Sequence, residues 1–343
     1  MSNHNSLSVG VLGTGWVALD RHIPSFRRNP FSRVTVVYDR TPGKATAAAR
    51  RHGLPHAATT LDEFFSHSPD IVSIATPPWT HRELALQAFA AGAHVFTEKP
   101  MAMSTAEAEE MAAAAKAADR KLCVSHNLLF SRSAGRARHL LGDTPDLVYA
   151  AGVQLSSHSR RLPSWYRQLP GGLLFDECPH LLYTLGSFLG PLTIDHVRGH
   201  VDDVGHPHQV EVLVSGSAPG QITMTFGAPV SEWQVVLVSR RRVVALDLFR
   251  DIAIDLPSDG AHGPAQVLGT SLRATGGHVR GVLTSGSRYL TRRLLYGHDR
   301  LISEFVDSIR LNRPSPIAVE DAISVVRLAE EIVAALGASH STP

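Results

Sequence analysis

Residues 8–18 read SVGVLGTGWVA, and this stretch decides the fold of the first part of the chain. The apolar residues 8–12 predict a short buried strand, and residues 13–18 follow at once with the pattern G-x-G-x-x-A. In this dinucleotide-binding fingerprint the first glycine makes a tight turn, and the second lets backbone amides approach a pyrophosphate. The small third residue lets the next helix pack against the strand, and that helix offers its positive end to the phosphates. The loop predicts cofactor contacts at Gly13, Thr14, Gly15 and Trp16.

The second strand ends in a side chain that selects between cofactors. Residues 34–38 read VTVVY, and Asp39 follows them. A carboxylate here accepts hydrogen bonds from the ribose hydroxyls of NAD and repels the 2′-phosphate of NADP. The neighbouring Arg40 favours the opposite choice, because a guanidinium can hold that phosphate. We predict NAD as the preferred cofactor and NADP as the alternative; a carboxylate that only caps a turn is the other reading of Asp39.

Strand and helix signals alternate from Ser8 to Val124, which is typical of a doubly wound parallel sheet. The strand at 70–75 runs into a loop that two prolines restrict, and the strand at 93–97 runs into Glu98-Lys99-Pro100. Ligands bind such sheets at the carboxyl ends of the strands. The further residues that we expect at the cofactor are therefore Thr76, Pro77, His81, Glu98 and Lys99.

Lys99 is the first candidate for chemistry. Pro100 cannot join a sheet ladder, so the strand stops there, and residues 104–107 then form an S-x-x-E capping box before an alanine-rich helix. An ammonium at the end of this strand can orient or deprotonate a substrate hydroxyl. The alternative is a surface lysine in a solvated turn, since charged side chains are mostly exposed.

A second motif, GGLLFDECPH at residues 171–180, supplies a carboxylate and an imidazole. Asp176 and His180 are four residues apart, so on a helix their side chains share one face. Histidine side chains ordinarily titrate near pH 6.5, which suits a proton shuttle. A structural hydrogen bond between the two residues is the alternative.

Taken in order, Gly13-x-Gly15-x-x-Ala18, Asp39, Glu98-Lys99-Pro100 and the segment at 171–180 resemble the glucose-fructose oxidoreductase / inositol dehydrogenase / MocA (Gfo/Idh/MocA) family. The resemblance covers essentially the whole chain. It implies that Lys99 and His180 face the nicotinamide as catalytic residues, and that Asp176 binds substrate or tunes His180. It also places the strand end with His126 and Asn127 over the pocket, as substrate contacts. Many members have glycine where this chain has Cys178, a thiol that we expect to be buried.

The fold class that follows is α/β: an N-terminal Rossmann domain at 1–125 and an α+β domain at 126–343. Strands are expected at 147–156, 193–201, 209–217, 221–226, 233–239 and 242–248, many with alternating polarity, so we predict a mixed, largely antiparallel sheet. In the family such a sheet often pairs with another subunit, which implies a homo-oligomer, a dimer or a tetramer. Residues 258–296 are hard to interpret and predict a partly ordered excursion or a solvated basic face. Trp165 is a further candidate at the substrate mouth.

Composition excludes several classes. The chain has 343 residues, 43% hydrophobic and 19% charged, with a formal net charge of +2, so nothing requires a nucleic-acid partner. The polar start and the absence of an apolar run of about 18 residues predict a cytoplasmic protein without a membrane partner. Two cysteines cannot build a disulfide framework. His200, His206 and His208 lack a recognised ligand spacing, so we predict no metal site.

Together these features predict an NAD(P)-dependent dehydrogenase or reductase acting on a CH–OH group of a sugar, cyclitol or related polyol. One alternative is a redox-neutral enzyme that uses tightly bound NAD transiently, as in epimerisation, elimination or glycoside cleavage. A second is a non-catalytic nucleotide sensor, which needs the glycines but not the proton-transfer residues. The substrate, the direction of reaction and the number of subunits do not follow from the sequence.

Overall fold

A computed structural model describes residues 6–142, 146–160, 162, 164–201, 206–291 and 294–339. The predicted polar start at 1–5, part of the turn at 202–205, and Arg292 and Arg293 of the predicted basic stretch lie outside these residues. The chain divides into two compact units. Unit 1 comprises Met1–Asn127 and Gly297–Arg327, and unit 2 comprises Leu128–Tyr296 and Leu328–Pro343.

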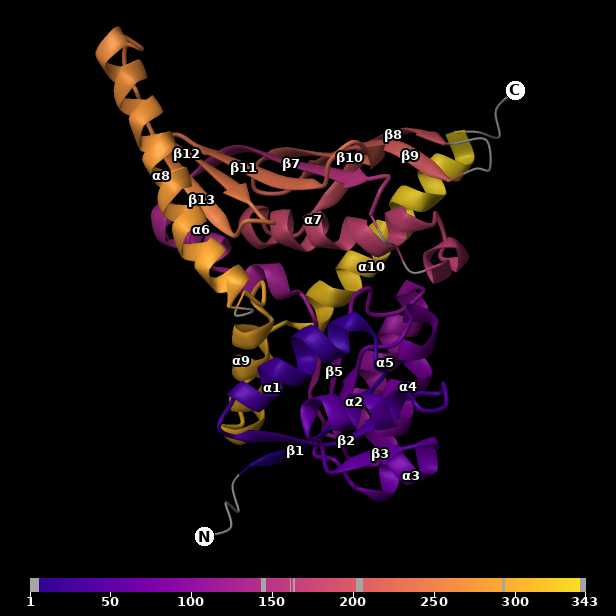
Figure 1. Ribbon diagram of the computed structural model, residues 1–343. Helices are drawn as coiled ribbons and strands as arrows, with labels where there is room; N and C mark the ends of the chain where they lie inside the picture. The colour runs from indigo at the N-terminus through magenta and orange to yellow at the C-terminus, as the bar shows by residue number, and fades with distance from the viewer. Residues whose placement is uncertain are drawn as a thin grey trace. The chain divides into compact units, whose positions relative to one another are not determined.

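Unit 1 is built on a six-stranded sheet in the order β3-β2-β1-β4-β5-β6 (Figure 1). All of its strand pairs are parallel, which confirms the predicted doubly wound sheet. Its central strands are almost entirely apolar and buried, as a sheet covered on both faces requires. The strands are β1 (Leu7–Leu12), β2 (Ser32–Tyr38), β3 (His56–Ala58), β4 (Ile71–Ile74), β5 (His94–Thr97) and β6 (Leu122–Val124).

Helices cover this sheet, and the capping signals in the sequence set where they begin. Ser104 caps the helix at Thr105–Ala117 by accepting a hydrogen bond from the Glu107 amide at 3.2 Å, as predicted. The helices of unit 1 are η1 (Ala18–His22, a π-helix), α1 (Ile23–Arg28), α2 (Lys44–His52), α3 (Leu61–Ser66), η2 (Pro78–Thr80), α4 (His81–Ala90), α5 (Thr105–Ala117) and α9 (His298–Arg310).

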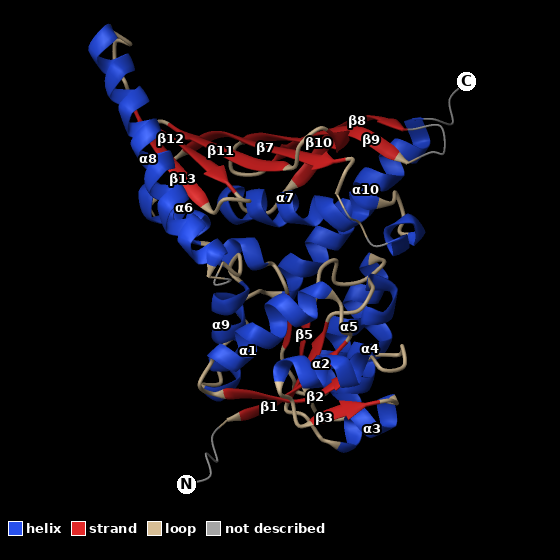
Figure 2. Ribbon diagram, viewed as in Figure 1, coloured by secondary structure: helices blue, strands red, loops and turns tan. Residues whose placement is uncertain are grey.

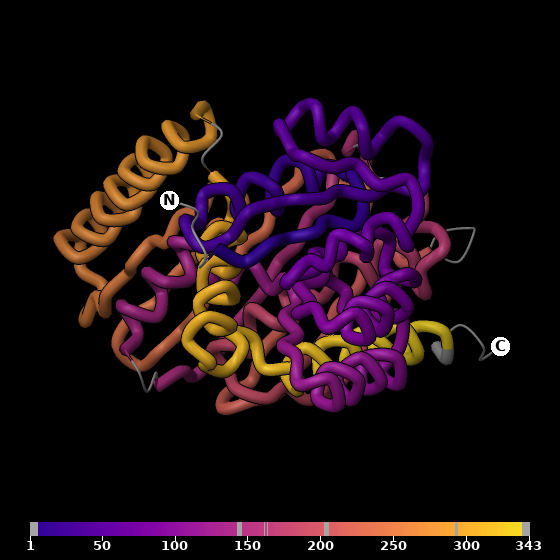
Figure 3. The backbone as a smooth tube through the Cα atoms, turned by 90° about the horizontal axis from the view of Figure 1, so that it is seen from below, coloured from indigo at the N-terminus to yellow at the C-terminus, as the bar shows by residue number. Residues whose placement is uncertain are grey.

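The segment 297–327, which the sequence analysis placed with the second domain, packs with unit 1 instead. Its helix α9 lies against α1 (Figure 3) and buries Leu301, Ile302 and Phe305. The Phe305 ring stands 5.7 Å from that of Phe96 on β5. The last helix, α10 (Val319–Ser339), contributes its residues up to Arg327 to unit 1 and the rest to unit 2.

Unit 2 contains a seven-stranded sheet in the order β13-β12-β11-β7-β10-β9-β8, with helix α7 (Leu173–Leu189) on one face (Figure 2). Among the described strands of this sheet, only β7 and β10 pair in parallel, so the predicted mixed, largely antiparallel sheet is confirmed. The strands are β7 (Leu147–Ser157), β8 (Thr193–Val201), β9 (Pro207–Ser215), β10 (Pro219–Ala228), β11 (Glu232–Ser239), β12 (Arg242–Asp247) and β13 (Ile252–Pro257); the other helical elements are η3 (Asn127–Phe130), α6 (Arg132–Leu141), η4 (Ser164–Gln168) and α8 (Pro264–Leu290).

Within the predicted excursion or basic face at 258–296, Pro264–Leu290 form the regular 27-residue helix α8, which the sequence analysis did not expect. Its glycines lower helix propensity, which is why the sequence suggested irregular structure. Tertiary packing compensates: a Cβ on Gly281 would lie 2.6 Å from Ile252 on β13, so only glycine permits this close approach. Among the described residues, none of the helices is both long and apolar enough to cross a membrane.

Candidate active site

The glycine loop after β1 has the geometry that a dinucleotide needs. Gly13 has a φ of 94°, and its amide donates to the Tyr38 carbonyl at 2.9 Å. A Cβ on Gly13 would lie 2.6 Å from the Ala75 carbonyl oxygen, whereas one on Gly15 would meet nothing nearer than the same oxygen at 4.0 Å. The exposed Gly15 therefore leaves open space beside the start of the next helix, and the loop fits a pyrophosphate there.

Asp39 is tied to this loop by hydrogen bonds. Its carboxylate accepts from the Thr14 amide at 3.1 Å and from the Thr14 hydroxyl at 2.5 Å, and the Thr41 amide donates to its other oxygen at 2.8 Å. Partial burial would raise the pKa of Asp39, but these hydrogen bonds outweigh burial and lower it. Asp39 is thus an anion beside the loop, while Arg40 and Trp16 are exposed. The structure brings the predicted residues Gly13, Thr14 and Asp39 together.

Glu98, at the end of β5, faces two histidines of unit 1. His22 Nε2 lies 2.8 Å from its Oε1 atom and His298 Nε2 lies 3.7 Å from the same atom, while its Oε2 atom accepts from the Lys99 amide at 3.2 Å. Burial would raise the pKa of Glu98, but the two histidines hold that pKa well below its ordinary value. Burial lowers the pKa of His22, so a neutral His22 donates to the Glu98 carboxylate.

These contacts hold the strand end from which Lys99 emerges, and a contact between Glu98 and the cofactor stays a prediction. The ligand atoms of His22, Glu98 and His298 lie within 4.8 Å of one another, close enough for all three to bind one metal ion. The other ring nitrogen of His22 lies 2.9 Å from Ser73 Oγ. The sequence analysis missed His22. The sequence shows only that a histidine follows Ala18 of the glycine motif by four residues, and this does not indicate a contact with Glu98.

His81 also has a positioning role. It is fully buried, and its ring nitrogens lie 2.9 Å from the Pro100 and Thr76 carbonyl oxygens. Burial lowers its pKa, so the neutral ring donates to one carbonyl at a time. The ring joins the loop after β4 to the Lys99-Pro100 segment, and a contact between His81 and the cofactor stays a prediction. Thr76 and Pro77, on the same loop, stay half-buried.

The end of β6 buries its polar residues. His126 and Asn127, which the resemblance suggested as substrate contacts, are 2% and 5% exposed. Burial lowers the pKa of His126 to about 3. The imidazole is therefore neutral at physiological pH, and both side chains could reach a substrate only as uncharged hydrogen-bonding groups.

In unit 2, helix α7 presents Asp176 and His180, which are both half-buried. His180 Nδ1 lies 2.7 Å from the Tyr183 hydroxyl, which also accepts from the Leu128 amide at 3.4 Å. The Trp233 ring stands 4.8 Å from the imidazole. Tyr183 and Trp233 thus hold the imidazole ring, and the Tyr183 hydroxyl engages its Nδ1 atom.

Between these two residues, Glu177 points into the core of unit 2 and was missed by sequence reasoning. It is 1% exposed, and it accepts hydrogen bonds from Gln154 Nε2 and Ser156 Oγ on β7, both at 2.5 Å, and from Arg160. Burial lowers the pKa of Arg160, and the nearby Asp176 charge acts in the opposite direction. Arg160 therefore couples the buried Glu177 to Asp176. The sequence signal that could have found Glu177 is an acidic residue among the mostly apolar residues of this helix, which indicates a buried charge that needs partners.

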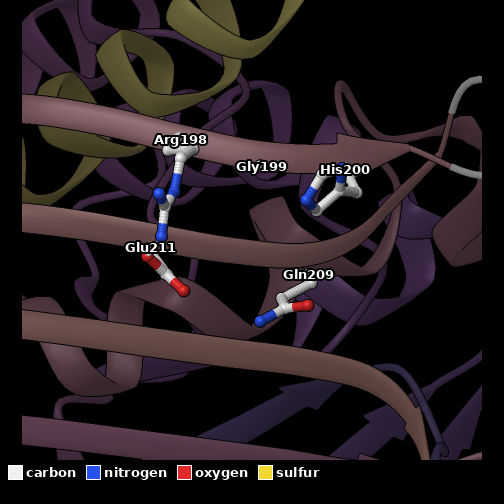
Figure 4. Close-up of a pocket in the computed structure, with 5 residues that line it drawn as sticks. All are labelled: Arg198, Gly199, His200, Gln209 and Glu211. Atoms are coloured by element: carbon white, nitrogen blue, oxygen red, sulfur yellow. Dashed lines mark hydrogen bonds and ion pairs between the residues drawn. The ribbon is translucent and has the colours of Figure 1, made fainter.

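Other predicted residues of unit 2 lie apart from this network. Trp165 is half-buried on η4, and Cys178 is buried as expected. His206 approaches within 3.3 Å of where a Cβ on Gly172 would be. His200 belongs to a 330 Å³ pocket on β8 and β9 whose lining is Arg198, Gly199, His200, Gln209 and Glu211 (Figure 4). Arg198 and Glu211 form an ion pair there at 2.5 Å.

Comparison with known proteins gives a consistent family assignment for unit 1. Residues 7–126 match the GFO_IDH_MocA profile, described as an oxidoreductase family with an NAD-binding Rossmann fold. A putative UDP-kanosamine synthase oxidoreductase subunit of Amycolatopsis mediterranei is 30% identical over 58% of this chain and 56% of that protein. The scyllo-inositol 2-dehydrogenase (NADP(+)) IolU of Bacillus subtilis is 39% identical over 31% of this chain and 33% of that protein.

The structural similarity to solved proteins extends beyond the segments that these sequence matches cover. The crystal structure of GenD2 from gentamicin A biosynthesis, in complex with NAD, superposes with a TM-score of 0.75 at 23% identity. The match covers 98% of this chain and 95% of that one. The two curated relatives align over about half of their length or less.

The two loop glycines should respond differently to alanine. Gly13→Ala forces a positive φ on an L residue and a clash with a backbone oxygen, so we expect about 1–3 kcal/mol lower stability. Gly15→Ala should leave the urea midpoint unchanged but weaken NADH binding, because its Cβ fills the space for the pyrophosphate. Urea denaturation and NADH fluorescence titration check both; equal stability of the two variants would contradict this geometry.

The buried histidines should make stability fall in acid. The pKa of His126 is lowered from 6.5 to about 3 in the folded protein. Below pH 6.5, His126 is therefore protonated in the unfolded chain but stays neutral in the folded protein. The free energy of unfolding should then drop by about 1.4 kcal/mol per pH unit for each such histidine. Urea midpoints at pH 7.5, 6.5 and 5.5 test this. His126→Gln should flatten the slope and the exposed His139→Gln should not; a wild-type midpoint independent of pH would refute it.

Proposed function

We propose that this chain is an NAD(P)-dependent dehydrogenase or reductase, because residues 7–126 match the Gfo/Idh/MocA oxidoreductase family with its NAD-binding Rossmann fold. It transfers hydride between a nicotinamide and a secondary alcohol or ketone of a sugar, cyclitol or related polyol. The observation that carries the proposal is the contact of Asp39 with Thr14 in the glycine loop. This contact supports Asp39 as the acceptor for the ribose hydroxyls and the loop as the binding segment for the pyrophosphate. The relatives named for UDP-kanosamine and scyllo-inositol support the substrate class.

When bound, the nicotinamide supplies the hydride acceptor or donor. The chain manages the proton of the substrate hydroxyl. Lys99, at the carboxyl end of β5, orients this hydroxyl through its ammonium, and His180 takes or returns the proton at Nε2. Asp176 hydrogen-bonds the substrate or tunes His180. Glu98 and His81 hold the segment that carries Lys99, and Tyr183 and Trp233 hold the His180 ring.

The proposed setting of the enzyme follows from the same features. We place it in the cytoplasm, where Cys123 and Cys178 stay reduced; both are buried and without a disulfide. The outer face of the C-terminal sheet exposes Val148, Val153 and Leu213, which supports assembly of a homo-oligomer through this sheet.

Lys99→Met should reduce kcat by about 10²–10⁴-fold, because it removes the ammonium that acts on the substrate hydroxyl while keeping the length of the side chain. NADH binding and the melting temperature should stay unchanged. The exposed Lys116→Met on α5 is the matched control. Turnover is followed both by substrate consumption and by reduced-nicotinamide absorbance. Unchanged kcat in the Lys99 variant would remove this role, and consumption without net absorbance change would identify redox-neutral chemistry.

Cofactor preference should depend on Asp39. Asp39→Ala removes the acceptor for the ribose hydroxyls and the charge that repels a 2′-phosphate, so we expect NAD binding about tenfold weaker and NADP binding stronger. Arg40→Gln should weaken NADP binding only. Titration of each variant with both reduced cofactors measures the ratio. A wild-type preference for NADP that Arg40→Gln abolishes would reverse the assignment.

A further inference from the structure

The outward face of α8 carries a stripe of large apolar side chains. Leu268, Leu272, Val279, Leu283 and Leu290 recur at intervals of four and seven residues, so they follow one face of the helix. Each is between 51% and 84% exposed. Within the part of the chain that the structure describes, these five residues, called the α8 stripe below, are therefore left uncovered.

The opposite face of α8 consists of small residues and packs against unit 2. Gly281 approaches Ile252 at the start of β13, and the buried Ser285 donates to the Asp251 carbonyl at 3.4 Å. Figure 1 shows α8 running along β13 and extending beyond the sheet. Amphipathic helices normally turn their apolar face to their own core. This helix turns its small face inward and its leucines outward, so the stripe belongs to an interface.

The extent of the stripe suits a protein interface. A helix of 27 residues is about 40 Å long, and monomeric proteins rarely expose apolar patches above a few hundred Å². A stable dimer needs about 800 Å² on each partner. Val282 and Tyr289, which flank the stripe on one side, are 43% and 68% exposed and widen the apolar surface toward that size.

We propose that the α8 stripe pairs with the α8 stripe of a second copy of this chain, antiparallel, with the two-fold axis at Val279. In such an isologous pair, residues equally far before and after position 279 face each other. Leu272 then faces Gly286, Leu283 faces Thr275, and Tyr289 faces Gly269. Leu268 faces Leu290 at the two ends. Between these ends and the axis, where Val279 meets its own copy, each large side chain faces a small residue, as close helix packing requires.

The charges of α8 are compatible with this pair. The helix carries Arg273, Arg280 and Arg288 and no acidic residue. At about 100° per residue, Arg273 and Arg280 stand roughly 90–110° from the centre of the stripe, so they stay in solvent.

A basic amphipathic helix can also lie on an anionic lipid surface. The alternation of large and small residues about Val279 favours a second copy, because a bilayer does not require small residues opposite leucines.

The first test is the mass of the full-length protein in solution, measured by light scattering after size exclusion over a range of concentrations. Leu272→Glu and Leu283→Glu should each halve the mass of the wild-type oligomer. Leu311→Glu, at a leucine 49% exposed beyond α9, is the matched control and should keep it. A monomeric wild type, or a mass that neither α8 variant lowers, would overturn the proposal.

The second test is a crosslink that only the proposed register allows. Helix axes 8–10 Å apart bring facing Cα atoms to about 5 Å, within disulfide range. Val279→Cys should therefore form a covalent dimer under mild oxidation, since Cys123 and Cys178 are buried. Arg273→Cys, turned away from the axis, should stay monomeric on a denaturing gel. Crosslinking of Arg273→Cys but not Val279→Cys would refute the register.

The effects of salt and of lipid vesicles distinguish the two possible partners of the α8 stripe, a second copy of the chain and an anionic lipid surface. An apolar self-pair should persist in 1 M NaCl, where binding to an anionic surface is screened. Flotation with phosphatidylserine vesicles uses the wild type and Leu272→Glu. Absence of binding supports the self-pair. Salt-sensitive vesicle binding that Leu272→Glu abolishes, together with a monomeric mass in solution, would assign the stripe to a membrane surface instead.

Discussion

The geometry of unit 1 depends on a buried carboxylate. Glu98 is desolvated, and an ionised carboxylate is stable there only because His22, His298 and the Lys99 amide surround it. These contacts join the helix after the glycine loop, the end of β5 and the start of α9. They explain why a segment near the end of the chain belongs with the first unit. They also fix the backbone at Lys99, so the proposed catalytic lysine is positioned by residues that need not touch a ligand.

The parts of this site that could be predicted from the sequence are local. The turn at Gly13 follows from backbone sterics within a few residues, and Asp39 lies one strand away from Thr14, so a short βαβ pattern was enough to bring them together. The roles of His22 and Glu98 were not accessible, because their contact joins positions 76 residues apart and depends on how the helix after the loop turns over the sheet.

Helix α7 shows the same limit within a single motif. Spacing alone predicted that Asp176 and His180 share a face, and both are half-buried on α7. Glu177, turned about 100° further around the helix, enters the core and needs Gln154, Ser156 and Arg160 to satisfy it. Those partners come from β7 and the residues after it, and no pattern within the motif indicates them. The adjacent acidic residues thus lie on different faces of α7: Asp176 on a half-buried face, and Glu177 in the core, where its hydrogen bonds tie the helix to β7.

The helix α8 was mispredicted because composition and periodicity disagree there. Its glycines argue for irregular structure by propensity, whereas leucines at intervals of four and seven residues argue for a helix. The structure explains one of these glycines, Gly281, by a close approach that a Cβ would prevent. Gly281 meets β13 on the inner face, and Gly286 leaves space on the outer face. A helix with such low intrinsic propensity gains its stability from contacts, and β13 supplies them on one side only. The exposed leucines therefore mark the side on which the remaining stabilisation must come from another molecule.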